Sequence, residues 1–186
     1  AMPEGMLYAA VMTSPVFGGQ LQSVGNKDAA LQQRGVVRIV ELSDAVAVVA
    51  DNYWRANKAL AMLQPVFCST DADNRSSTDI FADYDAALDS GERNQDVHLG
   101  DAVQALADAA DVVSANYRVP FLAHAAMEPM NCTVLFRDGR CEVWTGTQDN
   151  LGIRGRVASV AGLDENAVTV YPFYLGGGVG RRLPMS

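Results

Sequence analysis

The sequence predicts an α+β fold in which strands and helices alternate along most of the chain. Short β-branched runs at residues 36–42 and 45–50 are typical of buried strands. Segments with helical spacing or helix-capping residues separate such runs. With 186 residues, of which 49% are apolar and 19% charged, the chain has enough apolar material for a sizeable core.

Composition also limits the classes of partner. The net charge of −8, from 14 basic and 22 acidic residues, argues against nucleic acid or an anionic membrane as the main partner. No apolar run approaches the roughly 20 residues that a membrane-spanning helix needs. Two histidines, and three cysteines without C-x-x-C spacing, predict no metal site.

The first elements are a strand and a short helix. Residues 6–15 have β-rich character and end at a Ser-Pro turn signal. A helix is expected over residues 26–35, where Asp28 is the predicted N-cap and Gly35 the left-handed residue that ends the helix.

Two strands, at residues 36–42 and 45–50, are followed by a second helix. Asp51 is placed to cap this helix, which has to stop before Pro65. Its larger apolar side chains are expected in the core: Trp54, Leu60, Met62 and Leu63. This order of elements favours a sheet with helices on one face.

The middle of the chain has a different composition. Residues 69–100 are rich in Asp, Ser and Asn and are expected to form a linker or extended loop. An amphipathic helix is predicted over residues 100–113. Strand-like alternation follows over residues 112–124.

The last third predicts a hairpin, a helix and a strand. Asp138-Gly139 between two β-rich runs is a strong hairpin signal. Thr147 or Asp149 is placed to cap a helix that ends at Gly162. Residues 166–178 then form a strand that runs into a glycine-rich loop.

The glycine-rich loop is the first candidate site. Without Cβ atoms at Gly176, Gly177, Gly178 and Gly180, backbone N–H groups can approach a ligand closely. The loop is neither a P-loop nor a dinucleotide fingerprint, because no Gly-Lys-Ser/Thr and no helix-forming sequence follows it. Arg181 and Arg182 would suit an oxyanion. The other reading is a flexible tail or a bulge at a strand end.

Two further polar segments stand at predicted strand ends. His124 and Glu128 lie in an apolar, proline-flanked segment, either as a structural pair or as chemically active groups. Gln148 follows the second hairpin strand and belongs either to a helix cap or to a site for a planar polar ligand. Because ligand sites gather where neighbouring strands end, we expect these segments near the glycine-rich loop.

Three ordered motifs give a resemblance to a known family. FLAHAAMEPMNCTV, GRCEVWTGTQDN and YLGGGVGRRL resemble the molybdenum-binding large subunit of the xanthine dehydrogenase/aldehyde oxidase family, in its isoquinoline 1-oxidoreductase beta-subunit branch. GMLYAAVMTSPVFGG, GVVRIVEL and AVAVVADNYWRANKAL resemble the α/β hammerhead domain of the same subunit. The resemblance implies a hammerhead domain over residues 1–68, a linker over 69–100, and the truncated beginning of the molybdenum-cofactor-binding domain over 101–186.

The resemblance also implies a function. Enzymes of this family hydroxylate small aldehydes or electron-poor N-heteroaromatics with oxygen from water, and their electrons leave through iron–sulfur clusters of a partner subunit. The cofactor is molybdenum on a pyranopterin, often as a cytosine dinucleotide in this branch. Relatives are often exported with the cofactor loaded, so cytoplasm and periplasm both stay open as the compartment.

Site residues carry over by motif. Gly177, Gly178, Val179 and Gly180 would lie against the molybdenum centre with their N–H groups facing its oxo ligands. Gln148 and Arg181 complete the cofactor-binding set. His124, Met127 and Glu128 would line the substrate pocket or stand just behind it. Val179 occupies the place where the family has phenylalanine.

The same resemblance predicts that this chain alone is inactive. The family's catalytic base is a glutamate near the C-terminus of a much longer subunit, whereas no acidic residue follows Glu165 here. We therefore expect no catalytic residue in this chain, no retained cofactor, and uncovered apolar faces that favour self-association. The alternative is a non-catalytic α+β module that binds a partner or a small anion through residues 176–182.

Overall fold

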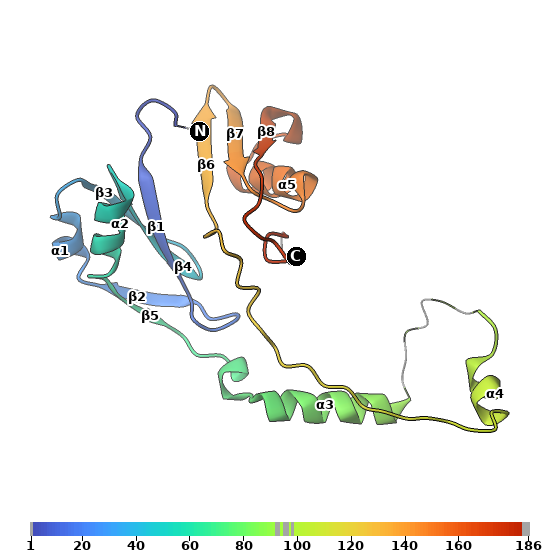
Figure 1. The fold of residues 1–186 in the computed structure, drawn as a ribbon. Helices are drawn as coiled ribbons and strands as arrows, with labels where there is room; N and C mark the ends of the chain where they lie inside the picture. The colour runs from blue at the N-terminus through green and yellow to red at the C-terminus, as the bar shows by residue number, and fades with distance from the viewer. Residues whose placement is uncertain (1, 92–93, 95–96, 98, 184–186) are drawn as a thin grey trace.

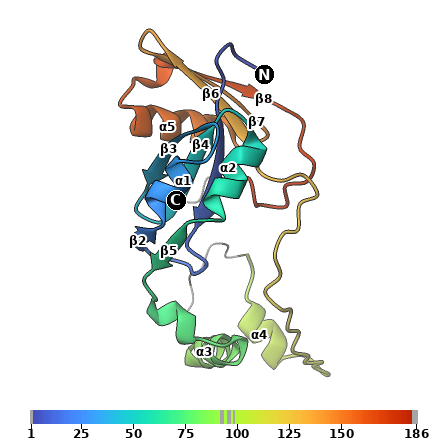
Figure 2. The same cartoon turned by 90° about the vertical axis from the view of Figure 1, so that its left-hand side faces the viewer.

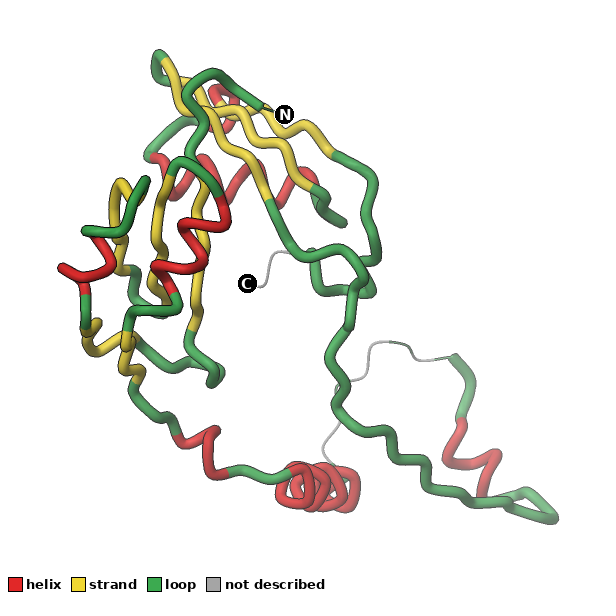
Figure 3. Tube along the Cα trace, turned by 60° about the vertical axis from the view of Figure 1, so that its left-hand side comes forward, coloured by secondary structure: helices red, strands yellow, loops and turns green. Residues whose placement is uncertain are grey.

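The computed structural model describes residues 2–91, 94, 97 and 99–183. Two bodies of mixed helix and strand, residues 2–68 and 123–183, lie beside each other in Figure 1. Between them in sequence, residues 69–122 form an extension that we call the acidic arm. The arm runs below both bodies and returns to the second one as a long extended segment, which is drawn green in Figure 3.

The N-terminal body is built on an antiparallel sheet of order β1-β4-β3, in which β1 is Tyr8–Thr13, β3 is Val36–Glu41 and β4 is Ala45–Ala50. The central strand β4 is the most buried. Val46 and Val48 are fully buried at the centre of the core. The predicted strands are therefore confirmed, because their β-branched side chains fill the interior of the sheet.

Helices α1 (Lys27–Leu31) and α2 (Tyr53–Leu60) lie on one face of this sheet (Figure 2). Ala30, Ala56 and Ala59 are fully buried there. A second pair of strands, β2 (Leu21–Gly25) and β5 (Gln64–Phe67), was not predicted from the sequence. Both strands are short, so their period-2 signal is weak.

The face assigned to α2 from the sequence was partly wrong. Leu60 and Leu63 are buried, as expected, but Trp54 is 68% exposed and Met62 is also exposed. Ala56, Ala59 and Leu60 form the contact face of α2, because the two small alanines let the helix approach the sheet closely. The Trp54 ring instead lies under the Lys58 ammonium, 5.6 Å from it.

The predicted helix caps also need correction. Asn52, not Asp51, caps α2, because its side chain accepts a hydrogen bond from the Arg55 N–H. The N-cap residue of α1 is Asn26 rather than Asp28, with left-handed backbone; its side chain does not cap the helix but donates to the Met62 carbonyl at 3.2 Å. Gly35 lies beyond the end of α1, at a φ of +82°, where an added Cβ would be 2.5 Å from the Asp51 carboxylate.

The arm contains a helix where a linker was expected. Helix α3 (Ser77–Ser90) follows the turn η1 (Asp71–Asn74). Its capping box reciprocally joins Ser76 and Asp79. Such a box is readable in the sequence, but the polar composition concealed it. Residues 92–93, 95–96 and 98 of the expected linker lie outside the described residues.

The two elements expected after that linker are also different. The helix predicted over residues 100–113 is only α4 (Ala102–Ala107), capped by Asp101, with no residue buried. The strand-like stretch 112–124 pairs with no strand among the described residues and runs as extended coil. Alternation alone does not make a strand where no partner strand lies alongside.

The C-terminal body is a sheet of order β6-β7-β8, made of β6 (Cys132–Arg137), β7 (Arg140–Thr145) and β8 (Val168–Pro172). The β6–β7 hairpin is confirmed, with Asp138 and Gly139 both at positive φ. Helix α5 (Asn150–Ala161) and the turn η2 (Glu165–Ala167) connect β7 to the parallel β8.

Helix α5 begins and ends as predicted. The Asp149 side chain accepts from the Gly152 N–H at the N-terminus, and Gly162 closes the C-terminus at a φ of +64°. A small core of Cys141, Val143, Ala158 and Val168 joins helix and sheet. The last strand is shorter than expected: β8 ends at Pro172, and the loop begins there. No helix among the described residues is long and apolar enough to cross a membrane.

Candidate functional site

The glycine-rich loop, residues 175–183, leaves the carboxyl end of β8 and folds back over the end of β7. There it meets residues 123–131, which enter β6, and residues 146–149, which lead into α5. The three segments singled out in the sequence thus meet at one edge of the second sheet. None of the three is helical at this edge, so side chains and backbone groups of each can reach the others.

Glu128 ties the start of the loop to the segment before β6. The Gly176 N–H donates to the Glu128 carboxylate at 2.8 Å, and the Glu128 N–H donates to the Gly176 carbonyl at 3.0 Å. A Cβ at position 176 would lie 2.4 Å from the Glu128 Cβ, so only glycine permits this approach.

Arg182 is the buried cation of the site, with 6% of its surface exposed. One of its Nη atoms donates to the Glu128 carboxylate at 2.8 Å and to the Glu128 carbonyl at 3.0 Å. The other lies 3.4 Å from the Gly146 carbonyl oxygen. Its buried Nε has no hydrogen-bond partner among the described residues. Removing either partner of such a pair leaves the other charge poorly compensated.

These contacts lower the pKa of Glu128. The Gly176 N–H is the largest cause, followed by the Asn131 side-chain amide, while partial desolvation opposes them and the Arg182 charge adds to the lowering. Glu128 is therefore a carboxylate at neutral pH. Because its oxygens already accept bonds from the loop and from Arg182, Glu128 acts as a clasp that fixes the loop.

Gln148 holds the far end of the loop. Its Oε1 accepts from the Gly180 N–H at 2.9 Å and from the Arg182 N–H at 3.3 Å. The backbone N–H of Gln148 donates to the Arg182 carbonyl at 3.2 Å. The Thr147 hydroxyl donates to the same carbonyl oxygen at 3.3 Å. With Oε1 occupied by the loop, the amide NH₂ of Gln148 has no partner among the described residues.

Between these two anchors the loop leaves backbone donors unused. The N–H groups of Gly177, Gly178 and Val179 make no hydrogen bond within residues 2–91, 94, 97 and 99–183. A Cβ at Gly178 would lie 2.7 Å from the Gln148 Oε1, so the loop backbone packs directly against the Gln148 side chain. Val179 has a φ of +52°, which is unusual for a β-branched residue.

The remaining predicted residues surround the loop without clasping it. The His124 Nε2 lies 3.5 Å from where a Cβ at Gly180 would be. Met127 is 93% exposed, and Arg181 points its exposed guanidinium away from the clasp with no ion pair among the described residues. The positions are therefore consistent with a shared site, while Arg181 and Met127 contribute no contact that fixes the loop.

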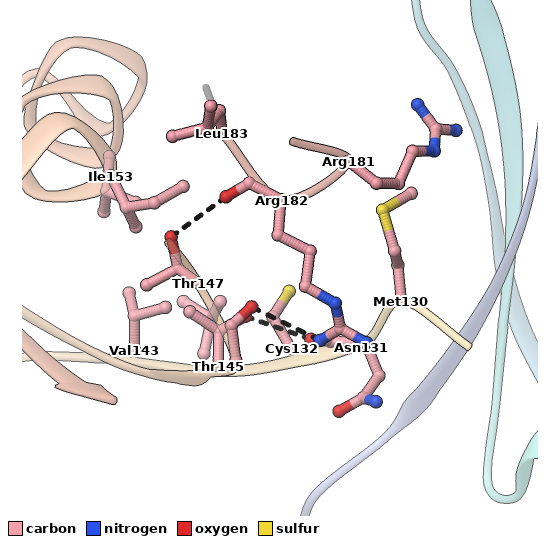
Figure 4. A pocket seen from close by; sticks show the side chains of 13 residues that line it. Met130, Asn131, Cys132, Val143, Thr145, Thr147, Ile153, Arg181, Arg182 and Leu183 are labelled. Carbon is pink, nitrogen blue, oxygen red and sulfur yellow. Dashed lines mark hydrogen bonds between the residues drawn. The ribbon is translucent and has the colours of Figure 1, made fainter. Parts of the chain in front are cut away.

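An apolar cavity of about 400 Å³ lies on the other side of Arg182 (Figure 4). It opens between β6, β7 and the first turns of α5. Its walls include Met130, Val143, Ile153, Val157 and Leu183. Among the described residues, no group of three His, Cys, Asp or Glu side chains could hold a metal ion. Arg181 and Arg182 also line the cavity, but because its surface is mostly apolar, a charged ligand would lose hydration there that the backbone N–H groups of the loop can replace.

The sequence predicted the three segments of the site but not the role of every residue in them. It treated Arg182 only as an oxyanion donor beside Arg181, and it did not foresee that the Arg182 side chain is buried against Glu128. Two adjacent arginines in a sequence give no signal of which one turns inward. The supporting roles of Asn131 and Thr147 were also missed, because single polar residues at strand ends are common.

Comparison with known proteins places this chain in a family. The profile of the molybdopterin cofactor-binding domain matches residues 87–186. The isoquinoline 1-oxidoreductase subunit beta of Brevundimonas diminuta is 30% identical over 189 residues, covering 96% of this chain and 24% of the relative. The molybdenum-binding subunit of Escherichia coli K12 aldehyde oxidoreductase is 23% identical over 202 residues, covering 95% of this chain and 27% of the relative.

Solved structures agree on the fold. The crystal structure of quinoline 2-oxidoreductase from Pseudomonas putida 86 superposes with a TM-score of 0.67 at 18% identity, covering 98% of this chain and 28% of that one. This chain spans about a quarter of the length of the curated relatives named here. Because the family profile matches more than half of the chain, the chain belongs to the molybdopterin cofactor-binding domain family.

Proposed function

We propose that this chain supplies one wall of the cofactor site of a molybdenum hydroxylase, with the glycine-rich loop against the molybdenum centre. The observation that carries the proposal is the set of unused N–H groups at Gly177, Gly178 and Val179, held in place by anchors on both sides. Preorganised backbone donors of this kind suit oxo ligands, which carry negative charge. The residues present therefore fit the molybdenum–pyranopterin group.

Each neighbouring residue has a part in this proposal. The side-chain oxygen of Gln148 accepts hydrogen bonds from the loop, so its NH₂ group is the part that can donate to the cofactor. Arg181 offers an exposed guanidinium to an anionic part of the cofactor, which we propose to be the cytosine dinucleotide form. His124 and Met127 line the neighbouring substrate pocket. Glu128 stands just behind that pocket and contributes by holding the loop in position. Val179 places a small apolar side chain beside the cofactor.

The group supplies the redox chemistry when it is bound: hydroxylation of a small aldehyde or N-heteroaromatic with oxygen from water. Relatives named for an aldehyde and for isoquinoline support this substrate class. We propose an iron–sulfur partner subunit as electron acceptor. Residues 1–68 would form the α/β hammerhead domain, residues 69–100 a linker, and residues 101–186 the beginning of the cofactor-binding domain.

What this chain's own residues do is positional. The Glu128–Arg182 pair and the Gln148 amide would hold the folded backbone of the loop in place beside the cofactor, and Thr147 and Asn131 fix the groups that hold it. No residue of the chain is proposed as the catalytic base. We accordingly propose that the chain alone does not turn over substrate and does not retain the cofactor.

A titration with tungstate, a stable tetrahedral oxyanion, tests the loop directly. The backbone amide resonances of Gly177, Gly178 and Val179 should shift on addition of tungstate. Gly178→Ala should abolish the shifts, because the new Cβ would displace Gln148. Gly155→Ala in α5 is the matched control, since a Cβ there meets Glu165 only at 3.4 Å. Unperturbed loop amides in the folded wild type would refute the oxyanion-binding loop.

Metal analysis separates the cofactor from a simple anion. Protein from a molybdenum-replete host should contain far less than one molybdenum per chain and no fluorescent pterin after oxidation. Stoichiometric molybdenum would contradict the proposed dependence on the rest of a longer enzyme. If the protein binds tungstate and is a stable monomer that does not self-associate through exposed apolar surface, the result would instead favour the non-catalytic anion-binding module. In that alternative Arg181, not the clasped Arg182, would meet the anion.

A further inference from the structure

The charge of this chain is concentrated in the acidic arm. Residues 69–122 hold eleven of the 22 acidic residues and only three of the 14 basic ones, a net charge of −8. The two bodies on either side are each balanced, with five acidic and five basic residues in the first and six of each in the second. The whole net charge thus lies within residues 69–122, whose described parts extend away from the bodies (Figures 1 and 3).

The arm combines this charge with uncovered apolar side chains. Helix α3 has no buried residue along its 14 positions. A groove of about 460 Å³ runs between α3 and residues 115–121, with aromatic walls from Phe81, Tyr84 and Phe121. Leu88, 77% exposed, stands at one end of the groove. Exposed apolar patches that are surrounded by charged or polar residues are typical of protein interaction sites.

The arm itself shows which chemistry this groove accepts. The Arg118 guanidinium lies over the Phe81 ring, 5.8 Å from its centroid, and pairs with Asp85 at 2.5 Å. The groove therefore already holds one guanidinium between an aromatic ring and a carboxylate. A second cation along α3 would need another carboxylate, because Asp85 is already paired with Arg118.

One carboxylate in the groove region lacks such a cation. Asp89 lies in the last turn of α3, where the helix dipole disfavours a negative charge, and that turn has no basic residue. Asp89 makes no ion pair or hydrogen bond among the described residues. A cation from outside the chain would relieve both the dipole and the local excess of negative charge.

We propose that the groove between α3 and residues 115–122 docks a partner protein segment that presents Arg among apolar side chains. Charge complementarity selects this occupant. A second copy of the chain is disfavoured, because two arms that each carry −8 would repel. The inference does not depend on cofactor binding, since the groove and the glycine-rich loop share no residue.

A binding assay with defined probes tests the proposal on the full chain. The probe is a fluorescent helical peptide with leucines on one face and arginines flanking them, together with an extended version of the same composition. The matched control peptide carries Glu at each Arg position. At least one Arg peptide should bind, with affinity falling about fivefold between 50 and 300 mM NaCl as the charges are screened. The Glu peptide should not bind.

Surface variants locate the contact. Leu88→Gln and Asp89→Asn change exposed side chains and should each weaken binding about threefold or more, as expected for contacts at the edge of an interface. Asp28→Asn, an equal charge change on α1, should leave the affinity unchanged. Failure of both Arg peptides to bind, or equal weakening by Asp28→Asn, would overturn the proposal. So would a stable dimer in sedimentation velocity that Leu88→Gln dissociates, because the occupant would then be a second copy.

Discussion

The two bodies of this protein are held together by different kinds of interaction. In the N-terminal body, ten buried apolar residues form one cluster around β4 and α2. In the C-terminal body, only four buried residues form the core between β7, β8 and α5. The edge of that body is fixed instead by the Glu128–Arg182 pair and by bonds from Gln148 to the loop.

The difference has a physical consequence. Apolar burial is non-directional and insensitive to charge, so it makes a stable support that tolerates variation in detail. Hydrogen-bonded charge pairs fix atoms more precisely, but they fail when either partner or the protonation state changes. The body that presents the candidate site is therefore the one whose geometry depends on charge. Hydrogen–deuterium exchange followed by mass spectrometry can report on the two bodies separately.

The largest effect is expected for Arg182→Leu. The substitution removes the cation that contacts Glu128 and the Gly146 carbonyl, at a cost of about 3 kcal/mol, because two carbonyl groups and a partly exposed carboxylate lose their donor. Exchange should increase in peptides that cover residues 123–131 and 175–183, and not in the β1-β4-β3 sheet. Arg181→Leu, next to it but exposed, should cost less than about 0.5 kcal/mol.

Equal increases in both bodies after Arg182→Leu would contradict the comparison. The two bodies would then unfold as one cooperative unit, and the clasp would not be local to the site.

A core truncation in the other body should have the next largest effect. Val48→Ala leaves a cavity at a fully buried position, at a cost of about 2 kcal/mol. Its effect should be confined to the N-terminal body in the same exchange measurement. Val11→Ala, on the exposed side of the neighbouring β1, is the control and should change little. Faster exchange in the glycine-rich loop after Val48→Ala would show that the bodies are coupled.

A helix cap tests a correction made by the structure. Asn52→Ala removes the side-chain acceptor for the Arg55 N–H and should cost about 1 kcal/mol. Asp51→Ala removes an exposed pair with the Arg55 guanidinium and an exposed hydrogen bond from the Asn52 amide, and should cost less. Denaturant unfolding measures both variants. A larger cost for Asp51→Ala would restore the cap assignment that the sequence suggested.

The smallest effect is expected from pH. Because the folded pKa of Glu128 is lowered, the folded state binds fewer protons, so this contribution is complete above the ordinary carboxyl value of about 4.3 and is lost as pH falls through the folded pKa. Loop peptides should lose some protection on acidification to pH 3.5. In Glu128→Gln the loop should be less protected at pH 7 and change less with pH. An unchanged pH response would assign the titration to another carboxyl.

The sequence predicted elements well where local signals were strong. Asp138-Gly139 specified the hairpin, and Asp149 and Gly162 specified both ends of α5, because capping and turn geometry depend on neighbouring residues. It failed where the outcome depends on distant partners. Trp54 turned outward because Ala56 and Ala59 bring α2 close to the sheet, and residues 112–124 have no partner strand in the part of the chain that the structure describes.

For the candidate site, the sequence by itself indicated the family and three motifs at strand ends, with glycines that allow close backbone approach. Only the tertiary structure decided which groups are used internally and which stay available. It turned Arg182 inward onto Glu128, left Arg181 exposed, and occupied the Gln148 oxygen while leaving the amides of residues 177–179 unbonded. The reason is that these choices depend on contacts between residues 32 to 54 positions apart in the chain, which no local pattern encodes.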